Sequence, residues 1–77
     1  MGLTVALIGC GAIAAKHLDA LVRNEHVDRV FAADPDEAAR ERLYARYGII
    51  KRLSSDWREL VADDEVQVVD ILTPHDS

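Results

Sequence analysis

The stretch Leu3–Ala14, with the sequence LTVALIGCGAIA, predicts how the chain begins to fold. Its first six residues form a nearly continuous apolar run, which is typical of a strand buried on both faces of a parallel sheet. From Ala12 onward the apolar residues recur with the spacing of a helix, and Gly9, Cys10 and Gly11 separate the two patterns. We therefore expect a strand, a tight glycine turn and a helix in direct succession.

The rest of the chain repeats this alternation of strands and helices. We expect a helix from Ala12 to Asn24–Glu25, a strand at Val27–Ala33, a helix from Asp34 to about Tyr47, a strand at Ile49–Leu53, a helix from Asp56 to about Val61 and a strand at Val66–Leu72. The fold class is therefore α/β, a Rossmann-like but incomplete βαβαβαβ parallel sheet of about four strands and three helices. With the expected strand order 3-2-1-4, a ligand would bind at the carboxyl ends of the first and fourth strands.

Local signals predict how the first two helices pack, begin and end. The first helix is expected to bury one apolar stripe, made of Ile13, Ala14, His17, Leu18, Leu21 and Val22. Asp34 is a candidate N-cap of the second helix, with Pro35 at its first helical position. Gly48 stands where a left-handed residue would end that helix.

The residues from Gly9 to Ala14 match the pattern G-x-G-x-x-A, placed between a predicted strand and a predicted helix. In this pattern Gly9 permits a tight turn, and Gly11 lets the backbone approach a pyrophosphate. The N–H groups of Ala12 and Ile13, at the positive end of the helix dipole, would then bind the phosphates without a basic side chain. The alternative is a glycine turn that binds nothing, because a lone motif of this kind is a weak signal.

Asp34 lies 20 residues after Ala14, at the end of the second predicted strand. An acid at this place can accept hydrogen bonds from an adenosine ribose, and its alternative role is to cap the following helix. The next three residues, at positions 35–37, include no Arg or Lys and would repel a 2′-phosphate. The expected cofactor is therefore NAD, and NADP is the weaker alternative.

An S-adenosylmethionine site is the rival interpretation of a glycine loop followed by an acid. Its loop usually reads acid-x-G-x-G-x-G. Here Leu7 occupies the position of the acid and Ile13 that of the third glycine. These two departures make a methyltransferase the weaker hypothesis.

The other chemistry-bearing side chains suggest neither a catalytic residue nor a metal site. Cys10 at a helix start could have a lowered pKa, but no nearby base supports a nucleophile. His17 is expected to be a packed, hydrogen-bonded histidine, and Trp57 a core or edge-packing aromatic. Asp63-Asp64-Glu65 is interpreted as a solvated turn.

Length and charge exclude several classes of protein. A chain of 77 residues is one small domain at most, without room for a separate substrate-binding lobe. Its net charge of -5 argues against nucleic acid as a partner. The first apolar run is too short to span a membrane, and the single cysteine favours a reducing, cytoplasmic location.

Taken in order, these motifs resemble the N-terminal part of the glucose–fructose oxidoreductase/inositol dehydrogenase/MocA family. The residues that carry the resemblance are Gly9, Gly11, His17, Asp34, Pro35, Asp36, Gly48, Asp56, Trp57, Glu59, Leu60, Thr73 and Pro74. No single one is specific, but the ordered set covers nearly the whole chain. The resemblance implies an NAD(P)-dependent oxidoreductase that moves a hydride between nicotinamide and a carbinol carbon of a sugar, cyclitol or related polyol.

The resemblance also implies how the cofactor would lie. The glycine loop and Asp34 would hold the adenosine diphosphate half, while Thr73, Pro74 and His75 would run toward the nicotinamide half. The family's lysine segment and substrate-binding sheet have no counterpart in this sequence, so residues 1–77 are expected to be the N-terminal part of a dinucleotide-binding domain. Its fourth strand would be an exposed edge that permits self-association. The alternative is a stand-alone nucleotide-binding or interaction module without catalysis.

Overall fold

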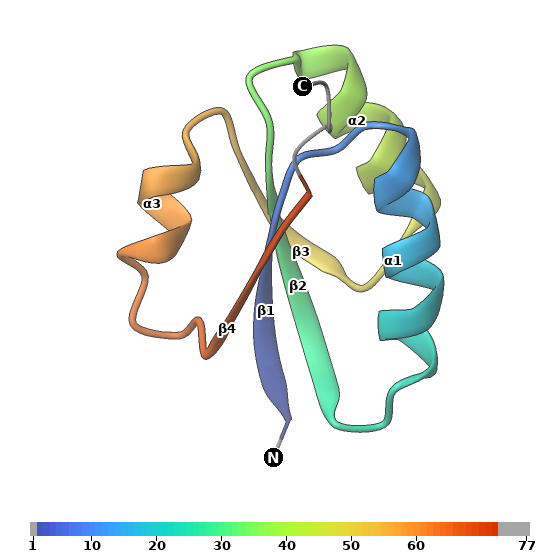
Figure 1. The fold of residues 1–77 in the computed structure, drawn as a ribbon, viewed down its shortest axis with the longest axis vertical. Helices are drawn as coiled ribbons and strands as arrows, with labels where there is room; N and C mark the ends of the chain where they lie inside the picture. Colours follow the sequence, from blue (N-terminus) through green and yellow to red (C-terminus); the bar gives the residue numbers. More distant parts are fainter. Residues whose placement is uncertain (1, 73–77) are drawn as a thin grey trace.

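The computed structural model describes residues 2–72, which form one four-stranded parallel sheet with three helices (Figure 1). In chain order the elements are β1 (Leu3–Ile8), α1 (Ala12–Arg23), β2 (Val27–Ala33), α2 (Glu37–Arg46), β3 (Ile50–Ser54), α3 (Trp57–Val61) and β4 (Val68–Ile71). The strand order is β3-β2-β1-β4, so the predicted fold class and strand order are confirmed. No helix within residues 2–72 is long and apolar enough to cross a membrane.

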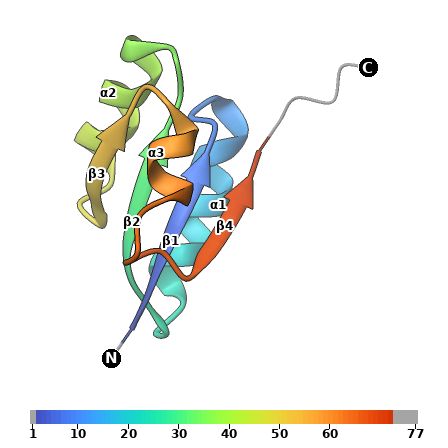
Figure 2. The same cartoon turned by 90° about the vertical axis from the view of Figure 1, so that its left-hand side faces the viewer.

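The helices cover both faces of the sheet (Figure 2). α1 and α2 lie on one face, where Leu18 of α1 packs in the same core as Leu7 of β1. α3 lies on the other face, where Leu60 packs with Phe31 of β2. Ala6 and Leu7 point to opposite faces of β1, and both are 0% exposed. This burial on both faces explains why β1 is a continuous apolar run.

β4 begins two residues later than predicted. At position 67 the side chain of Gln67, in addition to its backbone, makes the hydrogen bonds to β1. Its side-chain Oε1 accepts a hydrogen bond from the Thr4 N–H at 2.7 Å, and its own N–H donates to the Thr4 carbonyl at 3.0 Å. Val66 belongs to the preceding turn, since its N–H donates to the Asp63 carbonyl. The amino end of β4 is therefore fastened to β1 by a side chain.

Both predicted caps of α2 are wrong. The N-cap is Asp36 and not Asp34, because the Asp36 carboxylate accepts a hydrogen bond from the Ala38 N–H at 3.0 Å. At the other end, Tyr47 has an extended backbone, and within residues 2–72 only Gly9 has a positive φ. Gly48 is therefore not a left-handed cap, and the chain leaves α2 by an extended residue.

α1 buries a narrower stripe than predicted. Ala14 and Leu18 are 0% exposed, whereas Ile13 and Val22 are 53% and 51% exposed. The expectation that Ile13 and Val22 belong to the core is wrong. The reason lies in the sheet beneath the helix: β4 is its last strand in residues 2–72, and Ile71 of that strand is itself 61% exposed.

Candidate functional site

Gly9 follows β1 directly, at the place where the carboxyl ends of β1, β2 and β4 meet. Its N–H donates to the Ala33 carbonyl at 2.7 Å, and the Leu72 N–H donates to the Ile8 carbonyl at 2.8 Å. Gly9 has a φ of 110°, and a Cβ at this position would lie 2.6 Å from the Leu72 carbonyl oxygen. Both the backbone conformation and the close contact favour glycine. Gly9 therefore makes the tight turn that the glycine pattern predicts.

Gly11 is the N-cap of α1 and borders open space. Its φ of -76° and ψ of -166° suit any residue, and nothing lies within 4 Å of a Cβ built there. No side chain caps α1, and its first turn contains no acidic residue. The N–H groups of that turn, which include those of Ala12 and Ile13, therefore lack a capping side chain. The start of α1 has both the room and the hydrogen-bond donors that an anionic group needs.

Asp34 joins the end of β2 to the glycine turn. Its Oδ2 accepts a hydrogen bond from the Cys10 N–H at 2.8 Å, and its Oδ1 accepts one from the Asp36 N–H at 2.8 Å. Arg40 donates from Nη1 to the Asp34 carbonyl at 2.7 Å, which ties α2 to the same residue. Each carboxylate oxygen can accept more than one hydrogen bond, so Asp34 keeps capacity for a hydroxyl group of a ligand.

The Cys10 thiol is not activated by its position before α1. The residue is 4% exposed. Burial, together with the negative charge of Asp34, raises the pKa of the thiol to about 11, against the opposing charge of Arg40. A thiol with this pKa is protonated at neutral pH. The possibility of a reactive thiol with a lowered pKa is therefore contradicted.

A hollow of about 290 Å³ lies beside Asp34, at the carboxyl end of the sheet. We call it the Asp34 hollow; its lining consists of Ile8, Gly9, Ala33, Asp34, Pro35, Ser55, Trp57 and Leu72. Trp57 is 51% exposed, so the first of its two expected roles, that of a core aromatic, is wrong, and the second, that of an edge-packing aromatic, stays a prediction. The sequence cannot indicate this, because the hollow joins residues from the ends of three strands and the start of α3.

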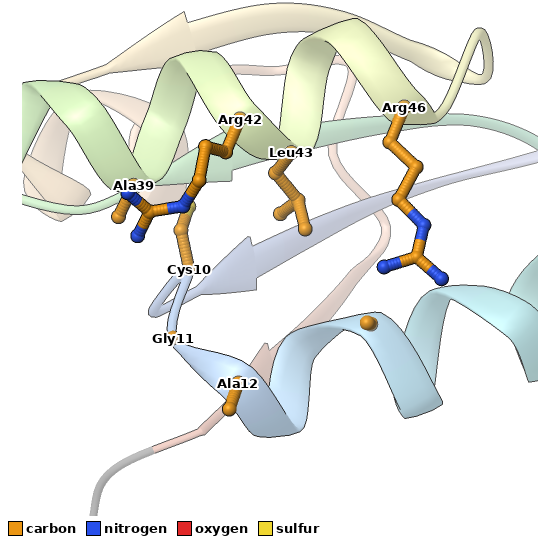
Figure 3. Close-up of a pocket in the computed structure, with 8 residues that line it drawn as sticks. Cys10, Gly11, Ala12, Ala39, Arg42, Leu43 and Arg46 are labelled. Carbon is orange, nitrogen blue, oxygen red and sulfur yellow. The ribbon is translucent and has the colours of Figure 1, made fainter.

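A second hollow of about 510 Å³ lies between α1 and α2 (Figure 3). Residues 10–12 of the glycine turn line one side, and Arg42 and Arg46 of α2 line the other. The two guanidinium groups extend from α2 into the space between the helices (Figure 3). The sequence does not place either cation beside the glycine turn, because α1 and α2 come together only in the fold. The signal that identifies them is a pair of arginines four residues apart, which lie on one face of a helix.

His17 of α1 lies beside Asp70 of β4, with 3.1 Å between Nδ1 and Oδ2. The prediction that His17 is hydrogen-bonded is confirmed, and its partner lies on β4, but the His17 side chain is 39% exposed and is not part of the buried stripe. Among residues 2–72, no three His, Cys, Asp or Glu side chains form a group that could hold a metal ion. Thr73, Pro74 and His75, the residues expected to run toward the nicotinamide, lie outside the described residues.

The chain is similar to several solved structures. GenD2 from gentamicin A biosynthesis, in complex with NAD, is 33% identical with a TM-score of 0.83, over 95% of this chain and 20% of that chain. The WlbA dehydrogenase from Chromobacterium violaceum, in complex with NADH and UDP-GlcNAcA, is 28% identical with a TM-score of 0.82, over 95% and 21%. An oxidoreductase from Desulfitobacterium hafniense, assigned as NADPH-dependent, is 29% identical with a TM-score of 0.83, over 99% and 21%. The chain thus spans about a fifth of the length of these proteins.

None of the curated proteins compared with the chain matches it. A family model, by contrast, matches residues 3–77, and its description is an oxidoreductase family with an NAD-binding Rossmann fold. This match confirms the resemblance that the ordered motifs indicate. The chain therefore belongs to the Gfo/Idh/MocA oxidoreductase family, of which it contains the NAD-binding Rossmann fold.

Proposed function

We propose that this chain binds the adenosine diphosphate half of a nicotinamide dinucleotide, as part of an oxidoreductase that acts on a sugar or related polyol. The observation that carries the proposal is the hydrogen bond from the Cys10 N–H to Asp34, which sets an acid beside the glycine turn. In a parallel sheet, ligands bind at the carboxyl ends of strands where the strand order reverses, and β1 lies at that point between β2 and β4.

The pyrophosphate would lie at the start of α1. Gly11 leaves open space at this point, where a Cβ would meet nothing of the protein itself. The N–H groups of Ala12 and Ile13 would donate to the phosphate oxygens, and the helix dipole favours a negative charge there. The residues present therefore fit a pyrophosphate without any basic side chain.

The adenosine ribose would bind the Asp34 carboxylate through its hydroxyl groups. NAD is the preferred cofactor in this proposal, because a 2′-phosphate would meet the negative charge of Asp34 and of the two acids at positions 36 and 37. Arg42, which lines the hollow between α1 and α2 together with residues of the glycine turn, would offset only part of that repulsion. NADP is therefore the weaker alternative.

The bound dinucleotide would supply the hydride transfer, and the described residues would hold the end of the cofactor remote from that chemistry. We assign no catalytic residue in this chain, since proton transfer needs a side chain positioned at the reacting carbon. Thr73, Pro74 and His75 are proposed to follow the cofactor toward its nicotinamide half. The sugar or polyol substrate is what the resemblance of the ordered motifs implies, and the UDP-GlcNAcA bound to the WlbA dehydrogenase supports it.

Residues 1–77 are proposed as the N-terminal part of the dinucleotide-binding domain, in which β4 accepts a further strand or a second copy of the chain. Val68, Val69 and Ile71 are 41%, 41% and 61% exposed, and β4 pairs only with β1 in residues 2–72. The free backbone groups of such an edge are a template for pairing. Sizing and dye binding test this: association or strong dye binding is expected, and a monomer without dye binding contradicts it.

The remaining predictions about partners and location rest on the sequence. The net charge of -5 disfavours nucleic acid, and we propose no membrane partner. A cytoplasmic location stays a prediction, which depends on the single cysteine, Cys10.

Calorimetric titration of the chain with NAD, NADP and S-adenosylmethionine tests the proposed function. NAD is expected to bind most tightly, and Asp34→Ala is expected to weaken it at least about tenfold, since a hydrogen bond to a charged group is worth roughly 1.5–3 kcal/mol. Asp64→Ala is the matched control, because it removes the same charge from the turn that precedes the amino end of β4. Circular dichroism confirms that each variant is folded. Preferential binding of S-adenosylmethionine, or equal NAD binding by Asp34→Ala, contradicts the proposal.

A further inference from the structure

Two arginines of α2 border the hollow between α1 and α2 without an acidic partner. Arg42 and Arg46 are both exposed, and within residues 2–72 neither forms an ion pair with a carboxylate. The helix itself offers them no acid, because the α2 residues three and four positions away are alanines, a leucine and each other. In a chain with a net charge of -5, this hollow is therefore a local site for a negative charge.

The two guanidinium groups lie at different ends of the hollow (Figure 3). The guanidinium of Arg42 lies toward Cys10 and Ala39, whereas that of Arg46 extends toward α1, and the Leu43 side chain lies between them (Figure 3). A single small anion would therefore contact one guanidinium at a time. A ligand that uses both cations needs two anionic groups held apart.

The Arg46 end of the hollow is held in place by a contact between the helices. The guanidinium carbon of Arg46 lies 5.4 Å from the centre of the Tyr47 ring. The Tyr47 hydroxyl donates to Asp19 Oδ1 at 2.8 Å, which fastens this ring to α1. Asp19 is the acid at this end, and it is engaged by Tyr47 and forms no ion pair with Arg46. Arg46 is thus oriented in advance, which lowers the entropic cost of binding a ligand.

The lining between the two cations is small and apolar. Ala12 and Ala15 of α1 face Ala39 and Leu43 of α2 across the hollow, and Ala39 and Leu43 are only 5% and 6% exposed. The volume of about 510 Å³ lies within the usual range for small-molecule sites. This hollow shares no lining residue with the Asp34 hollow. It therefore combines cationic ends with an apolar middle, in a place separate from the proposed ribose position.

We propose that the hollow between α1 and α2 binds an elongated small-molecule dianion, of the class of the linear dicarboxylates. One carboxylate binds Arg42 and the other binds Arg46, while the methylene chain between them lies over Leu43. The planar guanidinium of arginine matches a carboxylate through two parallel hydrogen bonds, which favours this anion at each end. The site uses side chains that the proposed cofactor site does not need, so it does not rest on the proposed function.

A nuclear magnetic resonance titration with a series of dicarboxylates from succinate to sebacate tests the proposal. The backbone amides of Ala15, Arg42 and Arg46 are expected to shift, with the amide of Lys51 in β3 unchanged. Affinity is expected to pass through a maximum as the chain lengthens, and the monocarboxylate of the same length should bind about fivefold more weakly. Affinity that is independent of chain length, equal binding of the monocarboxylate, or no shift in α1 and α2 with any dicarboxylate overturns the inference.

Substitution of the arginines supplies a second readout. Arg42→Gln and Arg46→Gln are each expected to lower the affinity for the tightest dicarboxylate about fivefold and to abolish its dependence on chain length. Arg23→Gln is the matched control, because it removes the same charge from the last turn of α1 and does not line the hollow. Circular dichroism confirms that each variant is folded. Unchanged affinity in both α2 variants, or an equal loss in Arg23→Gln, overturns the inference and leaves the proposed function intact.

Discussion

Gly9 and Leu72 lie so close together that a Cβ on Gly9 would come within 2.6 Å of the Leu72 carbonyl oxygen. Gly9 also has a φ of 110°, which residues with side chains rarely adopt. Gly11, two residues later, has neither constraint, because its φ is -76° and no atom lies within 4 Å of a Cβ built there. The two glycines of one motif therefore serve different purposes: Gly9 permits the fold, and Gly11 leaves room at the start of α1.

Substitution of each glycine by alanine separates these purposes. Gly9→Ala is expected to lower the free energy of unfolding by at least about 2 kcal/mol, because the chain must either strain or move β4 away from β1. Gly11→Ala is expected to change that free energy by less than about 1 kcal/mol but to weaken NAD binding at least about tenfold, since its Cβ enters the proposed pyrophosphate space. Urea unfolding and calorimetry measure the two effects. Loss of stability in Gly11→Ala, or normal NAD affinity in that variant, would contradict this division.

The preference between NAD and NADP is expected to depend on Asp34 and Arg42 together. Asp34→Ser removes the charge that opposes a 2′-phosphate, so the ratio of NADP to NAD affinity should rise by about tenfold or more. Arg42→Ala on that background should remove part of the gain, because Arg42 is a cation beside the glycine turn. Calorimetric titration of both variants measures the ratio. A ratio that Asp34→Ser leaves unchanged would show that Asp34 does not select the cofactor.

The buried thiol of Cys10 is expected to make stability depend on alkaline pH. In the unfolded chain the thiol ionises near its ordinary pKa of 9.0, whereas burial raises the pKa to about 11 in the folded chain. The unfolded state therefore releases its proton first, and the free energy of unfolding falls as the pH rises from 9 to 11. The loss should be on the order of 2 kcal/mol relative to Cys10→Ala, which lacks this titration. If the free energies of unfolding of the wild-type chain and of Cys10→Ala fall equally between pH 9 and 11, the raised pKa of the Cys10 thiol is contradicted.

The contact between His17 and Asp70 is expected to fasten α1 to the edge strand β4. Their side chains are 39% and 33% exposed, so solvent screens the pair and its contribution should be only about 0.2–1 kcal/mol. A double-mutant cycle with His17→Gln and Asp70→Asn, followed by thermal unfolding, measures the coupling. Strictly additive effects of the two substitutions would show that the contact contributes nothing to stability.

Most of the fold could be predicted from the sequence because its signals are local. The strand at Leu3–Ile8 and the strand at Val27–Ala33 have the bounds that their apolar runs predict. The N-cap of α2 was misplaced because Asp34 and Asp36 both precede the helix, and only contacts in three dimensions separate their roles. The exposed Ile13 was missed because helical periodicity shows a stripe but not where the sheet beneath it ends.

The candidate site was only partly predictable from the sequence, for the same reason. The spacing between the glycine motif and Asp34 predicts that they share one edge of the sheet, and Asp34 indeed accepts a hydrogen bond from Cys10, 24 residues away. The position of Trp57 depends on residues from three strands and a turn, which no local pattern joins. The approach of Arg42 to the glycine turn likewise depends on the packing of α2 beside α1 (Figure 3).

The central claim is that the start of α1 binds the pyrophosphate of the dinucleotide. The most direct measurement is a nuclear magnetic resonance titration of the isotope-labelled chain with ADP, in which each backbone amide is observed separately. The account predicts the largest shifts at the amides of Gly11, Ala12 and Ile13, with the amide of Lys51 in β3 unchanged. Saturating ADP that leaves the first two turns of α1 unshifted, or shifts confined to β3, would contradict the account.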